Sequence, residues 1–167
     1  GAIETVSRAL AAAGDAAQGL DFRGAITQTT LALTADPAHQ KAATQLTRFQ
    51  EFLAAQTFRK AMSDGYLALE QERFDDAAAA FQTAASIRPG AQEPQAANNE
   101  LASARTDAEL RDLRAQGKKL EASEDWKNAV DVYTQALAID DSLVFAREGT
   151  RRAQPRAALH AALETTL

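Results

Sequence analysis

The chain repeats itself at a fixed interval of 52 residues, and this repeat restricts the fold more than any other feature. Phe22, Phe74 and Trp126 are 52 residues apart, and five further sets of positions share that offset. Those sets are Ala25, Ala77 and Ala129; Thr29, Phe81 and Tyr133; Ala32, Ala84 and Ala136; Ala35, Ile87 and Ile139; and Pro37, Pro89 and Asp141. Six sets in one register are too many for chance. A repeated structural unit is therefore expected.

The apolar residues inside each repeat have helical spacing. Ala77, Phe81, Ala84 and Ile87 recur at intervals of three or four residues, which places them on one face of a helix. A second helical stretch lies upstream, across a short polar turn such as Glu72-Arg73. Each unit is therefore predicted to be a helix–turn–helix hairpin, and the fold class to be all-α.

Polar residues and prolines mark the expected helix ends. Asp75 and Asp125 are placed to cap helix N-termini, since a carboxylate accepts hydrogen bonds from free backbone amides. Pro89 is expected to end one helix. Asp36-Pro37 is read as a stop followed by the N-cap and first-turn proline of the next helix.

This arrangement resembles the tetratricopeptide repeat, in which a small residue in the first helix precedes an aromatic, Ala, aromatic, Ala and Pro. The matching residues of the middle unit are Gly65, Phe74, Ala77, Phe81, Ala84 and Pro89. Those of the last unit are Gly117, Trp126, Ala129, Tyr133, Ala136 and Asp141, and those of the first are Ala13, Phe22, Ala25, Thr29, Ala32 and Pro37. The resemblance implies an α-solenoid whose first helices line a groove for a protein or peptide. The groove positions that it implies are Arg59, Met62, Tyr66, Leu69, Arg111, Arg114 and Lys118.

The period departs from the family, whose unit has about 34 residues. The extra residues amount to about five helical turns, which preserves the inward face. We expect one helical repeat domain over residues 1–167, with units at about 6–37, 58–89 and 110–141, connecting helical segments at 38–57 and 90–109, and C-terminal capping helices over 142–167. Three helices per unit is the alternative.

Two features suggest breaks in the long helices. Thr106 and Glu109 resemble a capping box, which indicates a helix start within the second long segment. Pro155 is expected to open a new helix after one that ends near Arg152. The stretch from Ala38 to Glu72 contains no proline and is compatible with one continuous helix.

No group of residues points to catalysis, a cofactor or a metal. The chain has no cysteine, and His39 and His160 lack the partners of a zinc-binding helix. The acidic pairs Asp75-Asp76 and Asp140-Asp141 fall at helix boundaries, where capping explains them. We therefore expect a protein that is not an enzyme.

The function expected from the groove is the binding of a protein or peptide, and acidic groups are the candidates. Arg111, Arg114 and Lys118 share one helical face, which suits acidic side chains or a C-terminal carboxylate, although a solvated face is the simpler reading. A second basic cluster, Arg147, Arg151, Arg152 and Arg156, is interpreted as facing solvent. The alternative function is a spacer or homo-oligomerisation rod that pairs through Phe52 and Phe58.

Charge and hydropathy exclude other partners. The formal net charge of −5, with mixed signs along the chain, argues against a nucleic-acid surface. Nothing approaches the roughly 18 apolar residues that span a bilayer, so no membrane insertion is expected in this stretch. The start at Gly1 and the single Met62 suggest a fragment of a longer protein. The compartment is not determined, but the lack of cysteine and the many alanines resemble bacterial envelope proteins and favour a periplasmic location.

Overall fold

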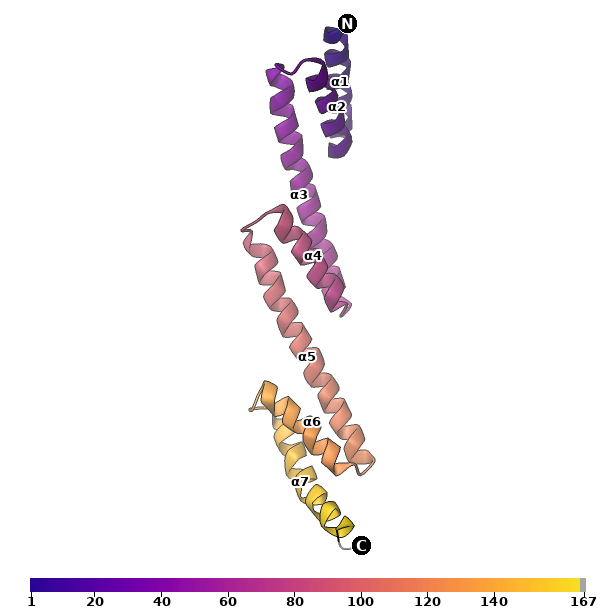
Figure 1. The fold of residues 1–167 in the computed structure, drawn as a ribbon, viewed down its shortest axis with the longest axis vertical. Helices are drawn as coiled ribbons and strands as arrows, with labels where there is room; N and C mark the ends of the chain where they lie inside the picture. Colours follow the sequence, from indigo (N-terminus) through magenta and orange to yellow (C-terminus); the bar gives the residue numbers. More distant parts are fainter. Residues whose placement is uncertain (166–167) are drawn as a thin grey trace. The chain divides into compact units, whose positions relative to one another are not determined.

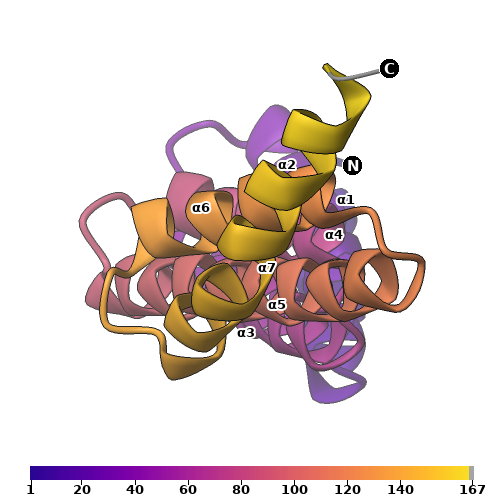
Figure 2. The same cartoon turned by 90° about the horizontal axis from the view of Figure 1, so that it is seen from below.

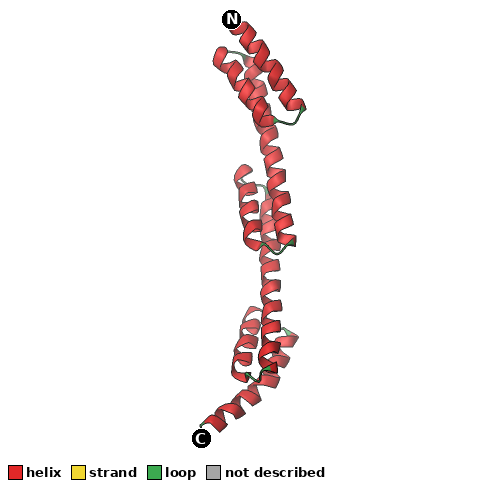
Figure 3. Cartoon of the chain, turned by 90° about the vertical axis from the view of Figure 1, so that its right-hand side faces the viewer, coloured by secondary structure: helices red, strands yellow, loops and turns green. Residues whose placement is uncertain are grey.

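The computed structural model describes residues 1–165, which form seven helices joined by short turns (Figures 1 and 3). No strand occurs in this range, so the chain is all-α as predicted. The helices are α1 (Ala2–Gln18), α2 (Phe22–Ala35), α3 (Gln40–Glu70), α4 (Phe74–Ile87), α5 (Gln92–Ala122), α6 (Trp126–Ile139) and α7 (Val144–Glu164).

The 52-residue period appears directly in the helix boundaries. α2, α4 and α6 each have 14 residues and begin at Phe22, Phe74 and Trp126, the positions that define the repeat. α3 and α5 each have 31 residues. One period therefore consists of a 14-residue helix, a four-residue turn, a 31-residue helix and a three-residue turn.

The turn before each 14-residue helix repeats the same backbone conformation. Leu20, Glu72 and Glu124 have positive φ angles of 60°, 55° and 59° and are 52 residues apart. In each turn the residue after this one donates a hydrogen bond to a carbonyl five residues back, as Arg73 N does to Ala68 O at 2.9 Å. This pattern closes the preceding helix by satisfying one of its last carbonyl groups.

The observed helix starts agree only in part with those predicted from the sequence. Pro37 lies within the four-residue turn, and α3 begins at Gln40 with His39 as its N-cap. Asp75 lies in the first turn of α4, whose N-cap is Arg73, so the predicted cap at Asp75 is wrong. The predicted cap at Asp125 is confirmed, since its side chain accepts a hydrogen bond from Asn128 N.

The long helices are continuous. α5 runs through Thr106 and Glu109 without a break, so the predicted helix start there is wrong. Thr106 instead donates its hydroxyl to Ala102 O, a bond that a threonine makes inside a helix. Pro155 lies inside α7 and does not begin a new helix.

The chain divides into two compact units, residues 1–101 and 102–167, and the boundary falls within α5. In unit 1, α2 packs against both α1 and α3, and α4 packs against α3 (Figure 1). The start of α5 joins that core, because Ala97 and Leu101 cluster with Phe81. In unit 2, α6 and α7 lie side by side (Figures 1 and 2), and Leu113 of α5 completes the core.

The repeat positions form these cores. The alanines at six of them are fully buried, and Phe81 and Tyr133 are 0% and 1% exposed. The six alanines are Ala25, Ala32, Ala77, Ala84, Ala129 and Ala136. Phe22, Phe74 and Trp126 are half-buried and pack against their cores. Burial at matched positions explains why these residue types recur.

Candidate basic pocket between α5 and α7

Two glycines bring α5 and α7 close to the same aromatic ring. A Cβ atom built on Gly117 of α5 would lie 2.5 Å from the ring of Tyr133, and one on Gly149 of α7 would lie 2.4 Å from it. Only glycine permits such an approach. The ring of Tyr133 thus sets the separation of the two helices and places their polar faces beside each other.

A small cavity of about 160 Å³ lies between these helices. It is lined by Arg114, Lys118, Tyr133, Phe145, Glu148 and Arg152. Pockets for drug-sized ligands usually measure about 300–1,000 Å³. The volume therefore suits a single side chain or a terminal carboxylate better than a whole metabolite.

On one side of the pocket, Arg152 and Tyr133 are both hydrogen-bonded to Glu121. Arg152 Nη2 lies 3.1 Å from Glu121 Oε1, and the Tyr133 hydroxyl donates to the same oxygen at 3.0 Å. Burial, and then the hydrogen bond to Glu121, raises the pKa of Tyr133 above its ordinary value. The hydrogen bond to Glu121 likewise raises the pKa of Arg152. The charge of Arg152 is therefore already matched.

The other side carries two cations that have no carboxylate partner in the part of the chain that the structure describes. Arg114 places its guanidinium carbon 5.6 Å from the ring centroid of Phe145 and forms no ion pair within residues 1–165. Lys118 follows one turn later and has no hydrogen bond or ion pair to any described residue. Glu148 lines the same cavity and offsets part of this charge. The opening therefore presents two neighbouring positive groups beside two aromatic rings.

The structure distributes the seven predicted groove residues over both units. Arg114 and Lys118 line the pocket, and Arg111 lies exposed on α5, one turn earlier, with an interaction of its own. In unit 1, Met62 and Leu69 are half-buried against the core clusters.

Tyr66 and Arg59 are the outward-facing members of the unit 1 set. Arg59 is exposed on α3. The ring of Tyr66 meets that of Phe81 edge-on at 5.2 Å between centroids. Partial burial, with Glu100 nearby, raises the pKa of the Tyr66 hydroxyl. Unit 1 therefore has an aromatic and an acidic residue, Tyr66 and Glu100, at this place. The matching residues of unit 2, 52 positions later, are the cations Lys118 and Arg152.

Sequence reasoning did not find the contributions of α7 to the pocket, namely Phe145, Glu148 and Arg152. The basic cluster of α7, read as facing solvent, makes several contacts. Arg152 pairs with Glu121, Arg147 Nε donates to Asp141 O at 2.7 Å, and Arg156 covers the ring of Trp126 at 4.7 Å. The 52-residue offset aligns Arg152 with Glu100 and Lys118 with Tyr66, but it does not indicate which of these residues lie together.

The residues considered for other chemistry have structural contacts. His39 Nδ1 accepts a hydrogen bond from Ala42 N at 3.1 Å, and His160 lies 3.6 Å from Glu164. Asp140 Oδ1 accepts hydrogen bonds from the backbone N and hydroxyl of Ser142, and these bonds lower the pKa of Asp140. Within residues 1–165, no three His, Asp or Glu side chains are grouped as a metal site would require. None of the described helices has the length and apolar character needed to cross a membrane.

Comparison with known proteins gave no match to any family model, curated protein or solved structure.

Proposed function

We propose that the chain is a tetratricopeptide-like solenoid of three helix–turn–helix units that acts as a non-catalytic binding scaffold for proteins or peptides. In this proposal the pocket of Arg114 and Lys118 receives a carboxylate group, from an acidic side chain or a chain terminus. Support comes from the repeat itself and from the way that Gly117 and Tyr133 occupy the small and aromatic positions of the resembled motif.

The observation that carries the proposal is that Lys118 has no ion-pair partner among residues 1–165 and lies beside Arg114 at a cavity the size of one side chain. A carboxylate there would accept charge-assisted hydrogen bonds from both cations. Phe145 and Tyr133 would cover the apolar part of the same residue. A partner with a carboxylate would thus supply the ion pair that no described residue makes with Lys118 and Arg114.

The non-catalytic part of the proposal rests on what the acidic residues do. Asp21 and Asp125 accept hydrogen bonds from the first turns of α2 and α6, and Asp140 closes a turn through Ser142. These carboxylates satisfy backbone amides. Their roles are structural.

The test is a selection of random heptapeptides, with either free or amidated C-termini, on immobilised chain. We expect the bound peptides to be enriched in Asp, Glu or free carboxylates. The affinity of one selected peptide, measured by fluorescence anisotropy, should fall by about tenfold or more in the Arg114→Glu, Lys118→Glu double variant, because two ion pairs become two repulsions.

Lys119→Glu is the control for the Lys118→Glu half of the double variant, since it makes that same substitution on the next residue of α5, which does not line the pocket. It should leave the affinity within about twofold. Equal losses in the control and the double variant, or selected peptides without acidic groups, would contradict the proposal.

The alternative function is a homo-oligomerisation rod, and burial leaves only one of its two candidate contact residues, Phe52, accessible to a second copy. Phe58 is only 6% exposed and is enclosed in the core, whereas Phe52 is 40% exposed and lies 5.4 Å from the ring of Phe22. Light scattering over a range of concentrations separates the two functions. A dimer that forms without a partner and is lost in Phe52→Lys would favour the rod.

A further inference from the structure

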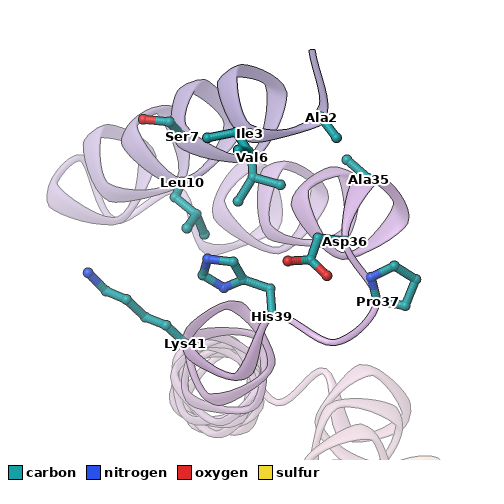
Figure 4. A pocket seen from close by; sticks show the side chains of 10 residues that line it. All are labelled: Ala2, Ile3, Val6, Ser7, Leu10, Ala35, Asp36, Pro37, His39 and Lys41. Carbon is teal, nitrogen blue, oxygen red and sulfur yellow. The ribbon is translucent and has the colours of Figure 1, made fainter.

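A second cavity lies in unit 1, where α1 meets the turn between α2 and α3 (Figure 4). Its volume is about 580 Å³, within the range of sites that hold small ligands or large side chains. Ile3, Val6 and Leu10 of α1 form its apolar wall, and Asp36 and His39 of the turn form its polar side. This cavity is separate from the basic pocket and shares no residue with it.

In the second copy of the repeat this position is filled by the chain itself. Val6 corresponds to Phe58, and Asp36 corresponds to Arg88, each 52 residues later. Phe58 is 6% exposed and packs against the core around Ala84 and Ile87. The guanidinium of Arg88 lies 5.0 Å from the centre of the Phe58 ring. The second copy of the site therefore contains its own phenyl ring covered by its own cation.

The first copy lacks both groups. Valine is too short to supply the ring, and Asp36 carries the opposite charge to Arg88. One Asp36 oxygen accepts a hydrogen bond from Ala38 N at 3.1 Å, and the carboxylate forms no ion pair within residues 1–165. In Figure 4 this carboxylate points toward the cavity near Val6, while Lys41 lies on the far side of His39. The first copy therefore has an apolar space beside a carboxylate that no described cation pairs with.

The histidine adds a directed donor. Its Nδ1 accepts the capping hydrogen bond from Ala42 N, so the neutral ring carries its hydrogen on Nε2. His39 lines the cavity with this ring, as Figure 4 shows. The site therefore combines an apolar wall, an N–H donor and a carboxylate.

We propose that this cavity binds an aromatic side chain of a peptide partner, and that a neighbouring Arg or Lys of the same peptide pairs with Asp36. The ligand thereby supplies the ring and the cation that Phe58 and Arg88 supply in the second copy. Burial of the ring provides most of the affinity, and the ion pair selects a basic neighbour. The site stands independently of the basic pocket, which selects the opposite charge.

The test uses the capped dipeptide acetyl-Phe-Arg-amide, titrated into the chain while backbone amide signals are followed by NMR. We expect concentration-dependent shifts at Val6, Ala35 and His39. Acetyl-Ala-Arg-amide should bind at least about tenfold more weakly, because it has no ring to bury. Acetyl-Phe-Glu-amide should bind about fivefold more weakly, because it repels Asp36.

Two variants test whether the dipeptide binds in this cavity. Val6→Phe fills the cavity from within, as Phe58 does, and should weaken binding by at least about tenfold. Asp36→Asn keeps the acceptor for Ala38 N and removes only the charge, so it should erase the preference for Arg over Glu. Lys118→Glu in unit 2 should change nothing, which separates this site from the proposed function.

Three results would overturn the proposal. One is equal binding of the Phe and Ala dipeptides, which would indicate charge attraction alone. Another is undiminished binding by folded Val6→Phe. The third is a set of shifted amides that lies away from Val6, Ala35 and His39.

Discussion

Tyr133 is held between two glycines, and this contact determines how α5, α6 and α7 pack. The ring is 1% exposed, and Gly117 and Gly149 lie against its two sides. At the matching place in unit 1, Phe81 faces Gly65 in the same way, with 2.4 Å from a built Cβ to the ring. In each core, a large aromatic ring therefore fills the space that a glycine leaves by having no Cβ.

Replacing Gly117 by alanine should destabilise the protein. The new Cβ would overlap the ring of Tyr133, which is also in contact with Gly149 on its other edge and cannot move away freely. We expect a loss of about 1–3 kcal/mol in the free energy of unfolding, despite the higher helix propensity of alanine. Urea unfolding followed by circular dichroism measures this change.

Gly14→Ala in α1 is the matched control, because a Cβ there meets nothing within 4 Å. It should stabilise the protein by about 0.5–1 kcal/mol. A gain in stability with Gly117→Ala as well would show that the close approach of ring and helix is absent.

The raised pKa of Tyr133 predicts a loss of stability in alkali. In the unfolded chain its hydroxyl titrates near the ordinary value of 10.0, but in the folded protein burial and Glu121 keep it protonated to higher pH. The contribution of the protonated Tyr133 hydroxyl to the free energy of unfolding is therefore complete below about pH 10, and it is lost as the pH rises through the pKa of the folded state. Tyr133→Phe should flatten the decline in unfolding free energy between pH 9 and pH 11, measured by urea unfolding at each pH. Identical slopes for both proteins would refute this.

At the scale of elements, the chain alternates short and long helices that share their packing surfaces. α3 extends for about 46 Å at 1.5 Å per residue, and its first half contacts α2 while its second half contacts α4. Phe49 and Phe58 lie on these two halves and enter different cores. The same long helix therefore packs against the short helix before it and the short helix after it. Because the extra residues of the period amount to whole helical turns, the apolar residues of both halves still face their cores.

Pro155 is the weak position of α7, since it lies inside the helix and cannot donate a backbone hydrogen bond. The corresponding residue of α5 is Ser103. Pro155→Ser should raise the free energy of unfolding by about 1–3 kcal/mol and increase the helix population of residues 156–164, measured by urea unfolding and by NMR chemical shifts. Pro89→Ser, in the turn before α5, should give no gain. The prediction fails if both variants behave alike.

At the scale of the whole chain, the cores are confined to single units. The cluster around Phe81 ends at Leu101, and the cluster around Tyr133 begins at Leu110 and Leu113. Between them, α5 carries mostly exposed residues. Where cores are local in this way, stability is approximately the sum of local terms.

Separate fragments of residues 1–101 and 102–167 should therefore each fold. We expect both to be helical and to unfold cooperatively, with midpoints within about 5 °C of the corresponding transition in the full chain, measured by circular dichroism during heating. A fragment that remains unstructured would show that the two units depend on each other.

The sequence alone determined the periodic part of this protein. The 52-residue offset aligned the alanines that the structure buries, and the three 14-residue helices begin at the aligned residues Phe22, Phe74 and Trp126. It succeeded because helical periodicity and burial are local properties of the chain. Local signals were wrong where they conflicted with packing, as at Thr106 and Pro155, which lie inside continuous helices.

The tertiary structure alone decided the two candidate sites. The basic pocket requires Phe145 and Arg152 of α7 to lie beside Lys118, and no local pattern places residues so far apart in the chain. The cavity at Val6 exists because a small residue occupies a place that Phe58 fills in the next repeat. Both sites depend on how side chains from different helices fill a shared space, which is decided only when those helices pack together.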